Sequence, residues 1–252
     1  MNLDKLKENW KKEELYAFKG WDFSHIEKRW EHEQIPWDYK EIVLKYIKIS
    51  DELLDMGTGG GEFLLTLNHP YNSTSVTEAY PPNVELCKNK LSPLGIEIKQ
   101  VFDDSDIPYE TNKFDIVINR HEAFNVDEVS RILKNDGYFI TQQVGGKNNN
   151  DLSEKLIDGF KPLFPKHDLK NNIKLLQKKG FKIILSDETF PKIKFYDIGA
   201  LVYFAKVIEW EFPNFSVDSC FENLCKLKKE LKEKGYISGT SHRFIIVAKN
   251  KK

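Results

Sequence analysis

The chain has 252 residues, of which 40% are hydrophobic and 31% are charged, so it can bury a core and does not belong to the disordered class. Its 38 Lys and Arg residues nearly balance 39 Asp and Glu residues, and the formal net charge is −1. Only four of the basic residues are Arg, the side chain that reads guanine edges and phosphates with paired hydrogen bonds. This composition disfavours DNA sequence readout and a chain-wide field for polyanions.

Targeting and membrane segments are not expected. Residues 1–15 are charged throughout and contain no apolar core of a signal peptide. The apolar stretch 200–210 is interrupted by two charged residues and is too short to cross a bilayer. The three cysteines suggest neither a disulfide framework nor a zinc site. We therefore expect a cytoplasmic protein with free thiols, without membrane association or a bound metal.

Residues 1–50 are predicted to be helical and are rich in aromatic side chains. In the segment Trp37–Ile49, apolar residues recur at i, i+1, i+4 and i+5, which is typical of an amphipathic helix. Two interpretations of this arm stay open: its rings pack it onto the main domain, or it forms a lid over a ligand pocket. The aromatic residues are Trp10, Tyr16, Phe18, Trp21, Phe23, Trp30, Trp37 and Tyr39.

From residue 51 the pattern changes to short apolar runs that alternate with helical stretches. The predicted strands are 53–56, 75–79, 97–102, 114–119 and 138–144, and the predicted helices are 62–67, 83–91 and 126–133. Because strands and helices alternate, we expect a parallel sheet with helices on both faces. The apolar run 114–118 suits a strand that is buried on both sides.

The second half of the chain continues the same α/β pattern after a loop at 145–150. The predicted elements are a helix that stops at Gly180, a strand at 181–186, a helix that ends near Gly235 and a final strand at 242–248, while 200–210 stays ambiguous. The expected organisation is a helical arm at 1–50 and one domain at 51–252, with a helical insertion at about 187–236 before the last strand.

The strongest chemical signal is a glycine cluster between the first strand and its helix. Residues 55–61 read Asp-Met-Gly-Thr-Gly-Gly-Gly, a D-x-G-x-G-x-G pattern. Glycines accept positive φ and allow a ligand to approach the backbone, and the following helix points free N–H groups at that ligand. Open α/β sheets bind ligands at this carboxyl end. The dinucleotide pattern G-x-G-x-x-G fails in both registers, because Glu62 or Leu64 stands at its third glycine.

With an acid two places before the first glycine, the cluster resembles the class I S-adenosylmethionine-dependent methyltransferase family. The second strand ends in an acid, Glu78, and the third is followed by the acidic loop 102–109. Residues 114–120 resemble the fourth strand of the family, and 131–139 resemble its turn into the fifth strand, with Asp136 in place of one glycine. The resemblance covers 51–145. It implies a Rossmann-like, seven-stranded, mostly parallel sheet.

The resemblance also implies S-adenosylmethionine as cofactor, with S-adenosylhomocysteine as product. Asp55 would face the positively charged methionine part, and Glu78 would hold both ribose hydroxyls, since a carboxylate accepts two hydrogen bonds. Asp103 or Asp104 would contact the adenine. The predicted cofactor-binding residues are Asp55, Met56, Gly57, Gly59, Gly61, Glu78, Ala79, Asp103, Asp104 and Asn119.

The candidate catalytic residues are His121 and Glu122, in the loop that opens onto the methyl group in this fold. His121 would accept a proton near neutral pH, and Glu122 would orient it or bind a cationic acceptor. Alternatively, both are loop residues without a catalytic role. The N-P-P-Y signature is absent, which argues against enzymes that methylate adenine or glutamine amides.

We expect a methyltransferase that transfers a methyl group to a small molecule by in-line displacement. A first alternative is an RNA or protein acceptor, for which nine lysines between 147 and 182 would supply a basic face. A second alternative is a protein that binds S-adenosylmethionine without turnover.

Overall fold

The computed structural model describes residues 3–17 and 23–252, so Phe18 and Trp21 of the aromatic arm lie outside the described residues. The chain forms two compact units. The accessory unit comprises 1–35, 145–166 and 189–242, and the sheet unit comprises 36–144, 167–188 and 243–252. The expected arm of residues 1–50 is thus divided between the two units after Ile35.

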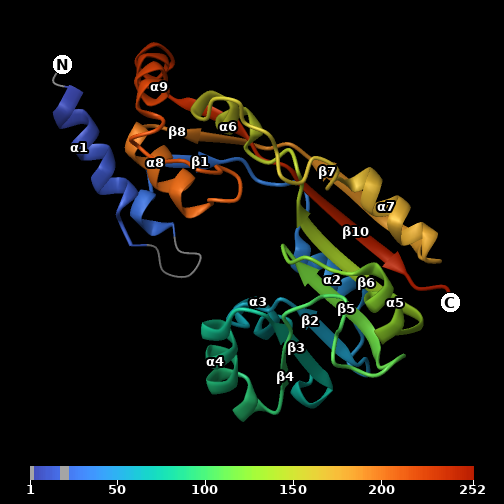
Figure 1. The fold of residues 1–252 in the computed structure, drawn as a ribbon. Helices are drawn as coiled ribbons and strands as arrows, with labels where there is room; N and C mark the ends of the chain where they lie inside the picture. Colours follow the sequence, from blue (N-terminus) through green and yellow to red (C-terminus); the bar gives the residue numbers. More distant parts are fainter. Residues whose placement is uncertain (1–2, 18–22) are drawn as a thin grey trace. The chain divides into compact units, whose positions relative to one another are not determined.

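The sheet unit is built on a seven-stranded sheet (Figure 1). Its strands are β2 (Leu53–Met56), β3 (Thr74–Glu78), β4 (Glu97–Gln100), β5 (Phe114–Arg120), β6 (Leu133–Val144), β7 (Lys182–Thr189) and β10 (Arg243–Lys249). They are ordered β4-β3-β2-β5-β6-β10-β7. The strands from β4 to β6 in this order are parallel, and β10 is antiparallel to β6. The expected seven-stranded, mostly parallel sheet is confirmed.

Helices cover both faces of this sheet because successive strand residues point to opposite sides. The helices are α2 (Tyr39–Tyr46), α3 (Glu62–Leu65), α4 (Pro81–Lys90), α5 (Val126–Ile132) and α7 (Leu169–Lys178). Leu53 joins the core that α2, α3 and α4 share, whereas Leu54 joins the core under α5 and α7. Because β2, β3 and β5 are parallel, their carboxyl ends lie at the same edge of the sheet.

Helix α2 is fixed to the sheet unit by specific hydrogen bonds. The Tyr39 hydroxyl lies 3.2 Å from the carbonyl oxygens of Asn119 and Ile140, and it accepts a hydrogen bond from the Asn119 N–H at 3.2 Å. The Trp37 indole N–H donates to Gln142 Oε1 at 2.8 Å. Trp37 and Tyr39 of the aromatic arm therefore contact strands β5 and β6.

The accessory unit contains a small antiparallel sheet that the sequence did not reveal. Its elements are α1 (Leu3–Glu14), the 3-10 turn η1 (Ser24–Ile26), β1 (Trp30–His32), α6 (Asn150–Leu156), β8 (Lys192–Phe195), α8 (Ile198–Val207), α9 (Phe221–Lys234) and β9 (Ile237–Thr240). The strand order is β1-β8-β9. Helix α8 covers most of the ambiguous stretch 200–210. Eight of its residues are buried, and seven of these belong to the hydrophobic core of this unit.

One guanidinium links three segments of the accessory unit. Arg29 donates to both carboxylate oxygens of Asp197, at 2.7 and 2.8 Å, and to Glu13 at 2.7 Å. Asp197 also caps α8 by accepting from the Ala200 N–H at 2.8 Å. These bonds join α1, the segment before β1 and the start of α8. Within the described ranges 3–17 and 23–252, no helix is long and apolar enough to cross a bilayer.

Candidate active site

The glycine loop leaves β2 in a conformation that side chains other than glycine rarely adopt. The φ values of Gly57, Gly59 and Gly61 are 67°, 63° and 75°. The N–H groups of Gly57 and Thr58 donate to the Thr77 carbonyl at 3.0 and 3.1 Å, which holds the loop against the end of β3. The loop is therefore a defined turn whose shape depends on its glycines.

Glu78, at the end of β3, lies beside this loop with a buried and fully positioned carboxylate. Its Oε2 accepts the Gly59 N–H at 2.7 Å. Its Oε1 accepts the N–H groups of Ala79 at 3.0 Å and of Tyr80 at 2.9 Å. Three backbone donors thus fix the carboxylate, while Oε2 keeps a lone pair for a further donor.

Asp55 is buried at the carboxyl end of β2. Its Oδ2 accepts the Thr58 hydroxyl at 2.7 Å. Burial raises the pKa of Asp55 to about 7, against the opposing effects of the Thr58 hydrogen bond and the nearby Arg120. An acid in this state becomes fully ionised only when a positive charge approaches it or the pH rises.

Glu122 meets the glycine loop directly. A Cβ placed on Gly57 would lie 2.4 Å from Glu122 Cγ, so this side chain covers the glycine at contact distance. Burial raises the pKa of Glu122, and Asp104 and Glu78 raise it further by charge repulsion. The structure thus brings together the glycine loop, the end of β3 and the loop after β5, which are separate segments of the sequence.

The two candidate adenine acids differ in their surroundings. Asp103 accepts the Ser105 N–H at 2.8 Å and the Ser105 hydroxyl at 2.6 Å, and these bonds lower its pKa. Burial, followed by repulsion from Asp103, raises the pKa of Asp104. Asp104 also lies near enough to Glu122 to affect its pKa. Asp104 is therefore the acid that belongs to the cluster around the glycine loop.

Asn119 shapes the loop that carries Glu122. It is fully buried, and its Oδ1 accepts from Gln143 Nε2 at 2.6 Å and from the Thr141 hydroxyl at 2.9 Å. Gln143 Nε2 also donates to the Glu122 carbonyl at 2.9 Å, and Asn119 Nδ2 donates to the Ala123 carbonyl at 3.4 Å. The Asn119 side chain thus holds the turn that follows β5.

Two other predicted cofactor residues also support the loop through packing. The Met56 side chain is buried in the core under α5 and α7, so it offers a ligand only its backbone. A Cβ on Gly61 would lie 2.8 Å from Leu91 Cδ1, so this glycine allows α3 to begin close to α4. Met56 and Gly61 therefore contribute to the motif by allowing the turn to pack closely.

His121 is part of a hydrogen-bonded relay that fixes its tautomer. The Trp37 indole can only donate, so Gln142 Oε1 accepts its N–H and Gln142 Nε2 must donate to His121 Nε2, 3.0 Å away. The neutral ring therefore carries its proton on Nδ1. Partial removal of the ring from water, followed by the positive charges of Arg243 and Arg120, lowers the pKa of His121. His121 is neutral, and its Nε2 is already engaged.

Sequence reasoning missed three contributors to this site: Trp37, Gln142 in its relay role, and Arg120. Arg120 ends β5, and its guanidinium lies over the Phe63 ring, 4.6 Å from the centroid. In the sequence, Arg120 is marked only by its position between a predicted strand and two candidate acid-base residues.

Two glycines form a matched pair that tests the ligand role of the loop. Gly59 and Gly95 both have positive φ, and a Cβ on either would meet no atom within 4 Å. Replacing either with Ala should therefore destabilise the fold by a similar amount, about 1 kcal/mol. Only Gly59→Ala should also weaken S-adenosylhomocysteine binding, which calorimetric titration would measure. Equal ligand affinities of the two variants would contradict a ligand that approaches Gly59.

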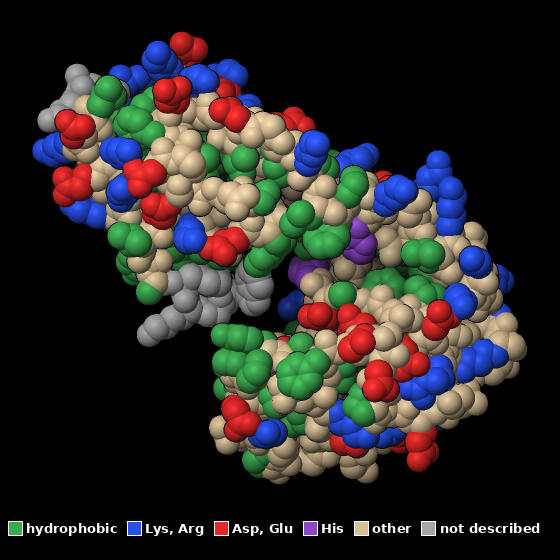
Figure 2. Space-filling model, in the orientation of Figure 1, with side chains coloured by type: hydrophobic (Ala, Val, Ile, Leu, Met, Phe, Trp, Pro, Cys, Tyr) green, Lys and Arg blue, Asp and Glu red, His purple; other side chains and the backbone are tan. Residues whose placement is uncertain are grey.

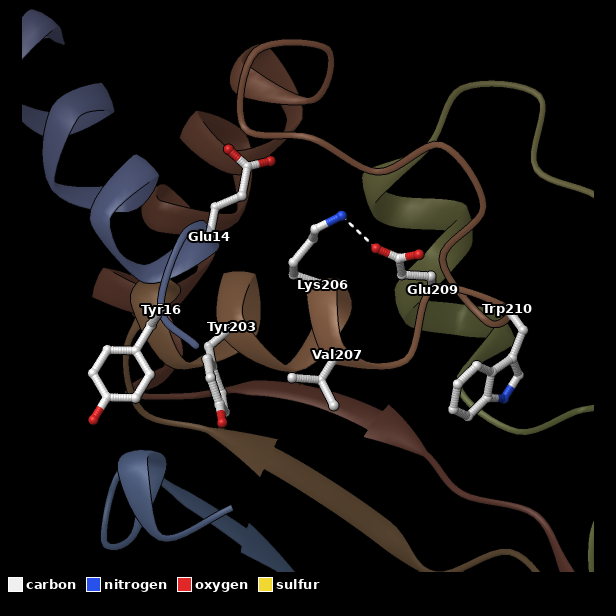
Figure 3. Close-up of a pocket in the computed structure, with 7 residues that line it drawn as sticks. All are labelled: Glu14, Tyr16, Tyr203, Lys206, Val207, Glu209 and Trp210. Carbon is white, nitrogen blue, oxygen red and sulfur yellow. Dashed lines mark hydrogen bonds and ion pairs between the residues drawn. The ribbon is translucent and has the colours of Figure 1, made fainter. Parts of the chain in front are cut away.

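A pocket away from the predicted site residues has a different lining. A pocket of about 330 Å³ lies in the accessory unit (Figure 3), and a Lys206–Glu209 ion pair borders it. None of the predicted site residues lines it. On the face drawn in Figure 2, Lys and Arg side chains are interspersed with Asp and Glu over each unit, so this face carries mixed charge.

Comparison with known proteins gives a family for the sheet unit. Residues 54–141 match the family described as "Methyltransferase domain". Two proteins of Methanocaldococcus jannaschii, MJ1252 and MJ0638, are similar over longer stretches, and both are described as uncharacterized. MJ1252 is 30% identical over 165 residues, covering 63% of this chain and 61% of that protein. MJ0638 is 28% identical over 208 residues, covering 78% and 82%.

Solved structures share the fold at low sequence identity. YcgJ of Bacillus subtilis has a TM-score of 0.56 at 17% identity and covers 85% of this chain and 98% of its own. Geranyl diphosphate C-methyltransferase of Streptomyces coelicolor, solved with Mg²⁺, geranyl diphosphate and S-adenosyl-L-homocysteine, has a TM-score of 0.52 at 12% identity, covering 84% and 78%. Residues 54–141 thus match a methyltransferase domain, and the sheet topology around them supports the resemblance to the class I S-adenosylmethionine-dependent methyltransferase family.

Proposed function

We propose that the protein is an S-adenosylmethionine-dependent methyltransferase that acts on a small molecule. The observation that carries the proposal is the Glu78 carboxylate, which three backbone N–H groups hold at the edge of the glycine loop. Such a preorganised acceptor suits a vicinal diol, since two hydroxyls can donate to one carboxylate. The ribose of S-adenosylmethionine presents this diol.

The residues around the loop fit the remaining parts of the cofactor. Gly59 borders open space, so a ligand can approach its backbone without meeting a side chain. Asp55 would stabilise the positively charged methionine part, and Asp104 would accept from the adenine amino group. When bound, the cofactor supplies a methyl group on a sulfonium, and the protein supplies orientation and a site shielded from water.

Between the two candidate catalytic residues, we assign the proton-accepting role to Glu122. Its pKa is raised by burial and by neighbouring acids, which brings a carboxylate closer to the range of a useful base. His121 would have to give up the Gln142 hydrogen bond before Nε2 could accept a proton. His121 therefore orients the loop, and Glu122 takes the proton from an acceptor that must lose one.

A small-molecule acceptor is favoured over RNA by the charge of the chain. The net charge is −1, and the visible face mixes both signs over each unit. A phosphate backbone is bound through many basic contacts, which a face of mixed charge does not concentrate. The structurally similar geranyl diphosphate C-methyltransferase also acts on a small molecule.

The proposal is tested by incubating the protein with methyl-labelled S-adenosylmethionine and a cell extract separated into metabolites, RNA and protein. We expect label in the metabolite fraction only, and none with the Glu78→Gln variant. Label in RNA or protein would replace the small-molecule acceptor with that class. Cofactor binding without label in any fraction would establish a binding protein without turnover.

A further inference from the structure

Arg120 occupies a distinctive place at the carboxyl end of the sheet. In the register of β2 and β5, Met56 pairs with Asn119, so Arg120 leaves β5 at the level where the glycine loop leaves β2. Its guanidinium rests on the ring of Phe63, the second residue of α3, at 4.6 Å. The cation is therefore held between the strand that carries the catalytic loop and the helix that follows the glycine loop.

No carboxylate of the described residues neutralises this cation through an ion pair or hydrogen bond. Two other arginines behave differently. Arg29 binds Glu13 and Asp197, while Arg131 binds Glu128 and two backbone carbonyls. Arg120 has only its ring contact and longer-range interactions, one of which lowers the pKa of Asp55. A guanidinium supported from one side keeps its donors for a ligand.

The surrounding charges specify which group that ligand would present. The site contains four acids, Asp55, Glu78, Asp104 and Glu122, which favour positive groups and repel negative ones. The methionine part of S-adenosylmethionine carries an ammonium and a sulfonium, but also an α-carboxylate. Arg120 is positioned to neutralise that negative group, and its planar fork can donate two parallel hydrogen bonds to a carboxylate.

We infer that Arg120 binds the α-carboxylate of the methionine part of the cofactor, an assignment that rests on the proposed function. In this assignment, one guanidinium recognises the negative carboxylate of the methionine part, and the acids around the glycine loop recognise its positive groups. Arg120 would hold the carboxylate beside Phe63, and the acids around the glycine loop would take the positive groups. A nucleoside without the amino-acid end would not use Arg120.

The test compares S-adenosylhomocysteine with 5′-methylthioadenosine, which keeps the adenosine and sulfur but lacks the amino-acid end. Arg120→Ala should weaken S-adenosylhomocysteine binding by about 10- to 100-fold. Its affinity for 5′-methylthioadenosine should stay within about twofold of wild type, since the removed contact is absent from that ligand. Calorimetric titration of both ligands gives this ratio directly. Arg120→Lys should retain part of the preference for S-adenosylhomocysteine over 5′-methylthioadenosine.

The matched control is Lys134→Ala, which removes a cation near the opposite end of β5, where Lys134 pairs with Asp115 at 2.6 Å. This variant should bind both ligands as wild type does. Wild-type protein that binds neither ligand would overturn the proposed function itself. Wild-type protein that binds both, with Arg120→Ala losing both equally or neither, would overturn the carboxylate assignment and leave the proposed function in place.

Discussion

Replacement of Glu78 by Gln is expected to weaken S-adenosylhomocysteine binding by about 100-fold. The change removes the negative charge that ribose hydroxyls would donate to. It also turns an amide NH₂ group toward a site where Gly59, Ala79 and Tyr80 already point their N–H groups. An unmatched set of donors in a buried site reorganises the loop as well as losing the ligand bonds. Calorimetric titration and a thermal shift with ligand measure the loss.

The control for this variant is Glu97→Gln. Glu97 lies on the neighbouring strand β4 and pairs with Lys113 at 2.7 Å, in a more exposed position. The Glu97→Gln variant loses the same charge a short distance from the site, so the effect of this substitution on ligand affinity should be small. If both variants bound S-adenosylhomocysteine as tightly as wild type, the ribose role of Glu78 would be wrong.

Asp55→Asn is expected to stabilise the unliganded protein at pH 8 while weakening cofactor binding. The pKa of Asp55 is raised by burial to about 7, from an ordinary value of 3.8. Near pH 3 both states hold the proton. As the pH rises from about 4 to 7, the unfolded chain loses its proton first, so the native state binds more protons and its stability falls. Asn removes this penalty, which amounts to roughly 2–4 kcal/mol at pH 8.

Urea unfolding of wild type and Asp55→Asn at several pH values measures how the free energy of unfolding of each protein changes with pH. The difference between the two proteins should grow from pH 4 to pH 8, and this difference isolates Asp55 from Glu122 and Asp104, whose pKa values are also raised. A constant difference would refute an Asp55 pKa near neutrality. S-adenosylmethionine should bind the variant more weakly, because the buried charge that opposes folding is the one that stabilises the cation.

The first five strands of the large sheet could be predicted because their signals are local. Strand β2 was predicted with its observed bounds, since an apolar run that ends at a glycine turn needs no distant partner to be recognised. Other strands differ by a few residues at their ends, and β6 begins earlier, at Leu133, because its pairing with β5 extends beyond the apolar run.

The small sheet of the accessory unit could not be predicted for the opposite reason. Strand β1 has three residues, which is too short for an alternating pattern to stand out. Its register with β8 pairs Trp30 with Phe195. Neither segment contains a sequence signal that identifies its pairing partner, so the pairing becomes visible only in the folded structure.

The candidate site divides in the same way. The sequence motif predicted Asp55, Glu78 and the glycines as neighbours because they stand at strand ends, and the structure places Glu78 on the glycine loop. The relay from Trp37 to His121 and the support of Arg120 by Phe63 depend on side chains that meet only after folding. The sequence contains the residues that make these contacts. It could not predict the tautomer of His121, nor that Arg120 has no ion-pair partner among the described residues.

The division of the chain into interleaved segments has a consequence for biosynthesis. The polypeptide crosses between the two units five times, after residues 35, 144, 166, 188 and 242. A ribosome that has released β1 must still synthesise β8 before β1 has a neighbour, and the sheet unit lacks β10 until residues 243–249 emerge. Neither unit can complete its sheet before β9 and β10 have been synthesised. Nascent chains should therefore stay open to proteases and chaperones until these two strands emerge, and removal of one unit by simple truncation should leave an insoluble fragment.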